Sequence, residues 1–299
     1  MTVSFRNYTP KPFFTDDYRK VREFLIHINS DKLYTPFYLW GAWEWQVTHG
    51  GFDRSRIDRF GLWEDDGKLV AMAIYEMPFG DGLLFVDEGY SHLKPELVSY
   101  AKKASHDDGK LRILLPDGDR EFGRSAISQG FRPTQKRWQS SALDIDKLQS
   151  FSLPEGFSFV SMADDWSWQQ YNRVMWRGFD HEGRAAYDEE TIAVRKQMLS
   201  SPMIMPELVV CAVAPDGNYV SHCGMWYQPG DGYCYVEPVV TDPEYRKMGL
   251  GKAVVLEAIR RCGALGAEQA VVGSSQQFYY SIGFYPIFTA TWWEMMQLG

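Results

Sequence analysis

The sequence predicts an α+β fold built as two similar domains, and three observations support this. Its 299 residues are about twice the length of one compact domain. Each half shows a similar coarse order of strands and helices. Short motifs also recur at nearly one offset: SQGFRP contains Gly130 and SIGFYP contains Gly283, while VDEGY at 86–90 matches VEPVV at 236–240. Duplication of one fold is therefore expected, with chance recurrence of short motifs as the alternative.

The second half gives the clearer pattern, in the order β, α, α, β, β, β, α, β, α, β. Asp164 is the expected N-cap of the first helix, and Pro/Gly/Asp/Asn turns separate the three central strands. Apolar residues from Leu250 to Cys262 fall on one face of a helix. The expected strands are 156–162, 207–214, 219–227, 232–240, 267–272 and 284–296, and the expected helices are 164–176, 188–199, 250–262 and 274–282.

The first half predicts helices at 13–28, 93–104 and 122–129 and strands at 69–76, 82–87 and 111–115. A polar stretch followed by Pro154 favours a boundary there, so we expect domains at 1–148 and 149–299. Trp40, Trp43 and Trp45 form a dense aromatic cluster. Packing in the core is the favoured interpretation, and a platform that stacks a ligand is the alternative.

Composition excludes several classes of protein. The formal net charge is −8 with a pI near 5.3, and no run of Lys and Arg could track phosphates, so we expect no nucleic acid partner. The apolar runs are too short to span a membrane, and the N-terminus lacks the apolar core of a signal peptide. All 4 cysteines lie in the second half without metal-ligand spacing. We expect a cytoplasmic protein with reduced, buried cysteines and no metal.

The strongest motif is RKMGLGK, at residues 246–252, between a predicted strand and a predicted helix. Glycines at such a junction let a ligand approach the backbone, and the first amides of a helix have no partner within the helix. The positive end of the helix dipole and the neighbouring basic residues favour an anion. A pyrophosphate cradle is therefore predicted. The motif fits neither the GxxxxGK[ST] loop nor the GxGxxG loop of a βαβ unit.

This motif, followed by a helix, a strand and FYYSIGF, resembles the GNAT superfamily of N-acetyltransferases that use acetyl-coenzyme A. The resemblance is motif-specific over about residues 206–290 and only architectural in the first half, as in a tandem GNAT protein with one degenerate copy. It implies that residues 236–240 line the pantetheine arm, with a bulge or splay at Pro238. The implied cofactor contacts are Val239, Val240, Arg246, Lys247, Met248, Gly249, Leu250, Gly251 and Lys252.

The same resemblance implies catalytic roles for two residues. Tyr279 corresponds to the tyrosine that protonates the departing thiolate, and it could instead simply pack its short helix. Glu237 is the candidate general base, with strand capping or an arginine pair as its alternative, and His222 is a second candidate. Many GNAT proteins place an asparagine after the fifth strand. Here only Ser274 or Gln276 could substitute for it.

The expected reaction is direct transfer of an acetyl group to the primary amine of a small molecule. The anionic second half favours a cationic acceptor, and its aromatic residues line the acceptor pocket or build the core. One cofactor site per chain is expected, because the first half lacks the glycines. The alternatives are a sensor that binds acyl-coenzyme A without turnover and a transferase that uses charged transfer RNA, which the acidity opposes. The oligomeric state stays open.

Overall fold

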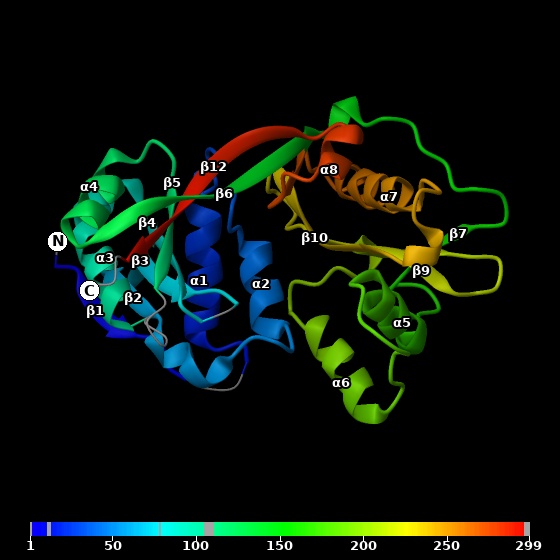
Figure 1. Cartoon of the computed structure of the whole chain (residues 1–299), viewed down its shortest axis with the longest axis horizontal. Helices are drawn as coiled ribbons and strands as arrows, with labels where there is room; N and C mark the ends of the chain where they lie inside the picture. The colour runs from blue at the N-terminus through cyan, green and yellow to red at the C-terminus, as the bar shows by residue number, and fades with distance from the viewer. Residues whose placement is uncertain (1, 11–12, 78, 105–110, 296–299) are drawn as a thin grey trace. The chain divides into compact units, whose positions relative to one another are not determined.

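The chain is described by a computed structural model that covers residues 2–10, 13–77, 79–104 and 111–295. Its contacts divide it into two compact units. Unit 1 contains the described residues of Met1–Val47, Gly51–Gln139 and Phe288–Gly299, and unit 2 contains Thr48–Gly50 and Ser140–Ile287. Helices and strands carry the labels of Figure 1.

Unit 1 has the strand order β1-β2-β3-β4-β5-β12. Strands β4 and β5 run parallel, whereas β1, β2, β3 and β4 are joined by antiparallel ladders. Helix α1 packs on β3, and α3 packs on β3 and β4. The elements are β1 (Ser4–Asn7), α1 (Asp16–His27), α2 (Trp40–Thr48), β2 (Gly61–Asp65), β3 (Lys68–Tyr75), β4 (Asp81–Val86), α3 (Lys94–Ala104), β5 (Arg112–Pro116), α4 (Arg120–Ser128) and β6 (Phe131–Asp144).

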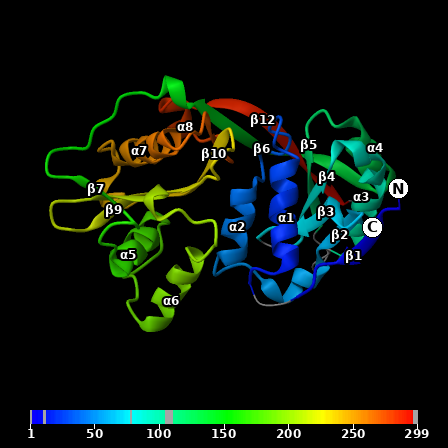
Figure 2. The same cartoon turned by 180° about the vertical axis from the view of Figure 1, so that it is seen from behind.

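Unit 2 has the strand order β6-β11-β10-β9-β8-β7. Helix α7 covers one face of β9 and β10 and α5 covers the other, as Figures 1 and 2 show from two sides. The elements are β7 (Ser158–Ser161), α5 (Trp168–Gly178), α6 (Glu189–Met198), β8 (Val209–Val213), β9 (Tyr219–Trp226), β10 (Tyr233–Thr241), α7 (Leu250–Ala264), β11 (Gln269–Val272), α8 (Gln277–Ser281) and β12 (Tyr285–Met295).

The order β, α, α, β, β, β, α, β, α, β occurs twice along the chain, once from β1 to β6 and once from β7 to β12. The closing strand of each series pairs outside its own series. Ser141 to Asp144 of β6 lie opposite β11, and Ala290 to Glu294 of β12 lie opposite β5. The units therefore differ from the expected division at 148 and 149, because β12 contributes its ladder to unit 1. Met296, the expected end of the last strand, lies outside the described residues.

One expected helix start was wrong. Helix α5 begins at Trp168, and the hydroxyl of Ser167 caps it by accepting from the Gln170 amide. The Asp164 carboxylate instead accepts from the amide and hydroxyl of Ser161, in the turn after β7. An aspartate can satisfy turn or helix amides equally well, so its presence alone did not fix the helix start.

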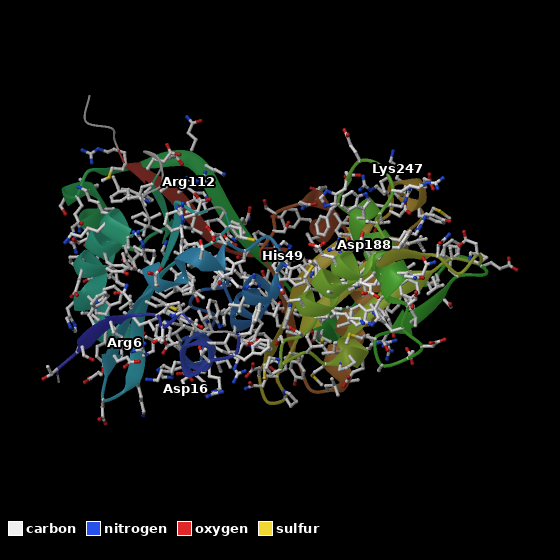
Figure 3. All side chains as sticks on the ribbon, turned by 90° about the horizontal axis from the view of Figure 1, so that it is seen from below. Arg6, Asp16, His49, Arg112, Asp188 and Lys247 are labelled. Atoms are coloured by element: carbon white, nitrogen blue, oxygen red, sulfur yellow. The ribbon has the colours of Figure 1, made fainter. Side chains whose placement is uncertain are left out.

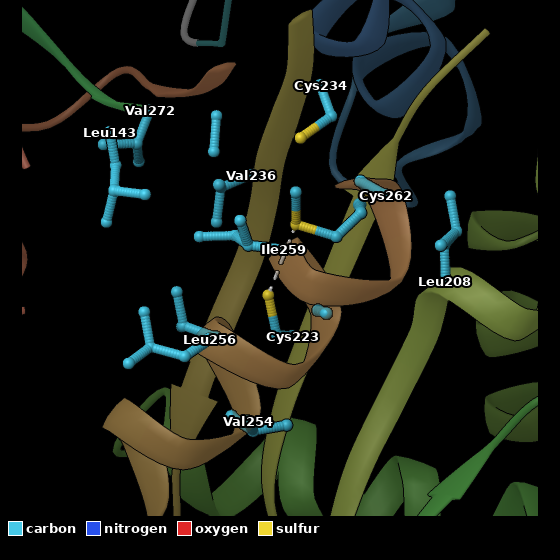
Figure 4. Close-up of a cluster of buried hydrophobic side chains, with 14 of the residues drawn as sticks. Leu143, Leu208, Cys223, Cys234, Val236, Val254, Leu256, Ile259, Cys262 and Val272 are labelled. Atoms are coloured by element: carbon cyan, nitrogen blue, oxygen red, sulfur yellow. Dashed lines mark hydrogen bonds between the residues drawn. The ribbon is translucent and has the colours of Figure 1, made fainter. Parts of the chain in front are cut away.

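Burial confirms two expectations about side chains. Trp40, Trp43 and Trp45 are at most 9% exposed, as a core cluster requires. All four cysteines are free and buried. Three of them, Cys223, Cys234 and Cys262, belong to the apolar core between α7 and the sheet of unit 2 (Figure 4). Burial raises the pKa of the Cys223 and Cys234 thiols, so these groups stay protonated and act as small apolar side chains.

Candidate active site

The predicted cradle is the turn between β10 and α7, where six successive backbone amides have no acceptor in the described chain. The Arg246 amide donates to Pro243, and the Ala253 amide donates to Gly249. Between them, the amides of 247–252 make no such bond, and α7 has no side-chain N-cap. A helix N-terminus with unsatisfied N–H groups and the positive end of the dipole attracts an anion.

The two glycines of the cradle meet different demands. Gly249 is the N-cap of α7 with φ +81°, a left-handed conformation that L side chains rarely adopt, and a Cβ there would meet no atom within 4 Å. Gly251 is held by packing, because a Cβ there would lie 3.1 Å from the Thr241 hydroxyl and 3.4 Å from the Phe278 ring. Gly249 therefore leaves the cradle open, while Gly251 lets α7 approach α8.

Arg246 braces the turn. Its guanidinium donates to the carbonyls of Thr241 and Gly178 and to both carboxylate oxygens of Asp180, at 2.9 to 3.2 Å. These contacts tie the turn to the end of α5. Its side chain, expected as a cofactor contact, is thus engaged with the protein.

The other predicted residues of the turn vary in their engagement. Lys252 donates to the Gln149 side chain at 3.0 Å. Lys247 has φ +66° and is exposed at the surface of unit 2 (Figure 3), and Met248 is 44% exposed. Leu250 is buried beneath the helix, so its contribution to an anion site is its amide.

A buried ionic cluster fixes the residues that precede the cradle. Asp242 is fully buried and pairs with Arg173 and Arg177 of α5 at 3.0 and 2.6 Å. Burial raises the pKa of Asp242, but the Arg177 hydrogen bond and further contacts lower it more, so the net shift is downward. Its carboxylate also accepts from the Glu244 amide and so caps the short turn Pro243–Tyr245.

Strand β10 has the expected irregularity at Pro238. Its register against β9 shifts between Val236 and Val239, which confirms the predicted bulge. The parallel ladder with β11 ends where Tyr235 lies opposite Val271, although pairing with β9 continues to Thr241. Beyond Tyr235 the two parallel strands no longer pair within the described chain, so the edge of β10 at Val239 and Val240 can take an added extended ligand.

Glu237 and Tyr279 are neighbours in electrostatic terms. Burial first, and then the nearby Cys223 and Glu237, raise the pKa of the Tyr279 phenol well above its usual value. Tyr279 is 7% exposed, and its hydroxyl has no hydrogen-bond partner in the described chain. The phenol therefore stays protonated at neutral pH. The Glu237 carbonyl accepts from the Trp226 indole at 3.0 Å, which holds the bulged segment.

His222 occupies a different environment. It is completely buried, its ring lies 5.1 Å from the Tyr171 ring on the α5 side, and its Nδ1 lies 3.0 Å from the Val210 carbonyl. Burial lowers the pKa of His222 to about 4. Complete burial beside the Tyr171 ring favours a packing role for His222.

Ser274 and Gln276 lie in the loop between β11 and α8. The Ser274 hydroxyl accepts from the Gln276 amide at 3.2 Å, and the Ser274 carbonyl accepts from the Ser141 hydroxyl at 2.8 Å. Gln276 is the exposed N-cap of α8 without a side-chain cap bond. Of the two expected contacts, the side-chain amide of Gln276 is therefore less engaged with the protein than Ser274.

The candidate acceptor aromatics separate into two groups. Trp226 and Tyr227 are buried, which assigns them to the core. Trp168 lines a cavity of about 630 Å³ between α5 and α6, together with Tyr187 and Lys196. The Lys196 ammonium lies 5.9 Å from the Trp168 ring centroid. The sequence could not separate these groups, because both consist of aromatic residues near helix or strand ends.

The corresponding turn of unit 1 contains no cradle motif. Helix α3 starts at Lys94, whose amide donates to the Ser91 carbonyl, and Pro95 follows without an N–H. The Lys94 ammonium is buried against Asp119 and Glu121 at 2.9 and 3.1 Å. The turn thus offers fewer free amides than 247–252, and it lacks glycine at the start of the helix.

Comparison with known proteins shows what unit 2 is similar to. Residues 164–286, inside unit 2, match the model of the acetyltransferase (GNAT) family. This part of unit 2 is thus similar to the GNAT acetyltransferases. A glucosamine 6-phosphate N-acetyltransferase from Trypanosoma brucei brucei is 32% identical over 78 residues, which is 23% of this chain and 53% of the relative. The chain thus spans about half the length of that curated relative.

Solved GNAT structures resemble the whole chain in fold. A GCN5-related N-acetyltransferase from Sphaerobacter thermophilus has a TM-score of 0.60 at 14% identity, covering 98% of this chain and 95% of that one. A tandem GNAT protein from the clavulanic acid biosynthesis pathway has a TM-score of 0.59 at 13% identity, covering 98% of each chain. At these identities the likeness shows the fold alone.

Two further findings concern the described residues of both units. Within the described residues, no helix combines the length and apolarity needed to cross a bilayer. Among the same residues, no group of three or more His, Cys, Asp or Glu side chains could hold a metal ion.

Sequence reasoning missed Asp180 as part of the site. It has φ +57° and binds Arg246 across 66 positions of the chain. Only its place between an expected helix and a glycine-containing loop was visible in the sequence, and that signal does not indicate a partner.

Proposed function

We propose that the chain is an N-acetyltransferase that moves the acetyl group of acetyl-coenzyme A to the primary amine of a small cationic acceptor. The observation that carries the proposal is the run of amides at 247–252 without an acceptor in the described chain, at the start of α7. Successive N–H donors without an acceptor at a helix N-terminus suit a pyrophosphate. The family match over 164–286 supports the choice of reaction.

The residues present fit coenzyme A. Backbone amides of Lys247, Met248, Gly249, Leu250, Gly251 and Lys252 would hold the diphosphate, and the open space at Gly249 leaves room for it. Val239 and Val240 would pair with the pantetheine amides where β10 leaves β11. Gln276 and Ser274 would contact the same arm from the loop before α8. When bound, the thioester supplies an acetyl group activated for attack by an amine.

We infer two proton-transfer roles. Glu237 accepts a proton from the attacking amine, so that nitrogen has a lone pair when the N–C bond forms. Tyr279 donates its phenolic proton to the sulfur as the C–S bond breaks. The raised pKa of Tyr279 keeps that proton in place at neutral pH. Direct attack fits the cysteines, since burial keeps Cys211 and Cys223 protonated and poorly nucleophilic.

The acceptor is proposed from charge and from the relative. Residues 151–299 hold most of the excess acidic charge of the chain, which attracts a cation. The name of the Trypanosoma relative adds an amino sugar phosphate to the acceptors worth assaying, beside polyamines and amines derived from amino acids.

We also infer that unit 1 is a degenerate second copy of the GNAT fold. Its elements follow in the same order as those of unit 2, and its turn before α3 lacks the glycines and free amides of the cradle. One molecule of coenzyme A per chain is therefore expected.

Calorimetric titration with coenzyme A, followed by release of free thiol in the presence of an amine panel, tests the proposal. Binding with a stoichiometry of one and amine-dependent thiol release support it. Binding without release from any amine would favour a sensor. Absence of binding would remove both functions. Tyr279→Phe and Glu237→Gln, assayed beside the wild type, tell turnover at this site from background hydrolysis.

A further inference from the structure

The two units share a corner with the same hydrogen bonds. In unit 1 the Asp87 amide donates to the Val70 carbonyl, its carboxylate accepts from the amide two residues on, and its carbonyl accepts from the Tyr90 amide, at 2.8 to 2.9 Å. In unit 2 Asp242 makes the corresponding bonds with Val220, the amide two residues on, and Tyr245, at 2.9 to 3.1 Å. Asp87 and Asp242 are therefore structural counterparts.

The first helix of each unit faces this aspartate with its last turn. In α5, Arg177 lies 2.6 Å from Asp242, and Arg173, one turn earlier on the same face, lies 3.0 Å from it. In α1, His27 Nε2 lies 2.9 Å from the Asp87 carboxylate, and the residue one turn earlier is Glu23. Two guanidinium groups thus fill the corner in unit 2, whereas unit 1 has an imidazole and a carboxylate.

A cavity lies beside this corner in unit 1, and its lining includes Glu23, His27 and Asp87. Its volume is about 420 Å³, within the usual range of small-molecule sites. Phe24, Leu69 and Val70 are buried side chains of its lining. A second cavity of about 220 Å³ shares His27 and Asp87 with it. A lining that combines buried apolar side chains with charged ones suits a short alkyl chain that ends in a charged group.

The charged residues of the cavity lining determine whether the charged end of the ligand is a cation or an anion. Three carboxylates line the cavity, those of Glu23, Asp65 and Asp87. Glu23 has no hydrogen bond or ion pair in the described chain, and Asp65 accepts only from the Tyr90 hydroxyl, at 2.8 Å.

The basic groups of the lining offset the carboxylates only in part. Lys20 is engaged with Glu64, a residue outside the lining, at 2.8 Å, and His27 is hydrogen-bonded to Asp87. Lys68 is exposed and makes no side-chain bond in the described chain. Two lysines therefore oppose three carboxylates in the lining, a formal charge of −1 without His27, which favours a cation.

We propose that this cavity in unit 1 binds a small molecule that carries a guanidinium group, in the place where unit 2 holds the guanidinium groups of Arg173 and Arg177. The planar fork of a guanidinium suits carboxylates such as Asp87 and Glu23, which can accept two bonds each. The site is separate from the proposed acetyl transfer in unit 2, and neither requires the other.

Calorimetric titration of the full chain with propylguanidinium chloride tests the proposal, with sodium propionate as the anionic control. Saturable binding of one propylguanidinium and none of propionate is expected. Glu23→Gln and Asp87→Asn should each weaken binding at least about tenfold, and asparagine keeps the capping bond of Asp87. Asp66→Asn is the matched control, because it removes one carboxylate from the neighbouring turn outside the cavity lining.

Glu23→Arg gives the sharpest test, because it restores the arrangement of unit 2. It should pair with Asp87, fill the cavity and abolish propylguanidinium binding while preserving the thermal midpoint. Undiminished binding to Glu23→Arg, no saturable binding to the wild type, or equal loss in Asp66→Asn would each overturn the proposal. Coenzyme A affinity, measured on the same samples, reports separately on unit 2.

Discussion

Replacing Gly249 by glutamate places a negative charge at the cradle, and Gly249→Gln is its isosteric control. Both side chains require a residue with Cβ at φ +81°, which costs about 1 kcal/mol of stability in each variant. A Cβ at this position meets no atom within 4 Å. Glutamate and glutamine have nearly the same size, so the rest of the side chain has the same steric effect in both variants. The difference between the two variants therefore isolates charge.

The expected difference follows from Coulomb's law. A carboxylate about 6 Å from one phosphate charge raises the energy of the complex by about 0.7 kcal/mol at a dielectric constant near 80 and about 2.8 kcal/mol near 20. Coenzyme A should bind Gly249→Glu roughly 3- to 100-fold more weakly than Gly249→Gln. The gap should narrow in 1 M salt, where the screening length falls to about 3 Å.

Isothermal titration with coenzyme A at low and high salt measures both quantities, and circular dichroism melts check that the two variants fold alike. If Gly249→Glu binds coenzyme A as tightly as Gly249→Gln does at low salt, the diphosphate does not lie at this corner. The placement of the cofactor, and the acetyltransferase proposal built on it, would then be refuted.

Three further predictions concern single side chains. Tyr279→Phe should lower kcat by about 10²- to 10⁴-fold with little change in coenzyme A affinity, and loss of affinity instead would indicate a packing role. Asp180→Asn removes a charged acceptor from Arg246, so the KM for acetyl-coenzyme A should rise several-fold while kcat stays unchanged. A fall in kcat with KM unchanged would contradict the role of Asp180 in positioning the turn. Asp242→Asn should lower the free energy of unfolding by about 3 kcal/mol at pH 7, measured by urea denaturation, because two arginines lose a buried partner. Folding lowers the pKa of Asp242, so its carboxylate contributes fully to the free energy of unfolding above the unfolded pKa near 4. That contribution is lost as the pH falls through the lower pKa of the folded state. The free energies of unfolding of the wild type and Asp242→Asn should therefore converge at low pH.

Local patterns predicted most of the elements of unit 2. Apolar spacing from Leu250 to Cys262 gave helix α7, and glycine and proline turns gave strands β8, β9 and β10 close to their observed limits. Pairing between distant segments was not visible. Strand β6 was missed because its residues from Arg132 to Arg137 are polar and mostly exposed, which removes the alternation that marks a strand.

In the candidate site, too, local features were predicted from the sequence and contacts between distant elements were not. Glycine, proline and tyrosine at fixed positions indicated the cradle, the bulge at Pro238 and the place of Tyr279, since each depends on a local backbone requirement. The brace from Arg246 to Asp180 depends on how α5 meets β10, where Gly178 packs against Val240 so closely that a Cβ would lie 2.5 Å from the valine. Such contacts arise from the packing of distant elements, and no local pattern encodes them.

If both binding proposals hold, the two aspartate corners explain how one fold takes different ligands. Asp242 and Asp87 keep the same three backbone contacts, so the turn itself does not decide what binds. The residues next to the turn determine which ligand binds. In unit 2, arginines of α5 neutralise Asp242 from within, and glycines after Tyr245 free the amides for a diphosphate. In unit 1, Pro95 and the Lys94 pairs close the amide side, while α1 has Glu23 and His27 at the positions where α5 has its two arginines. The same corner thus favours an anion on one face in unit 2 and a cation on the other face in unit 1.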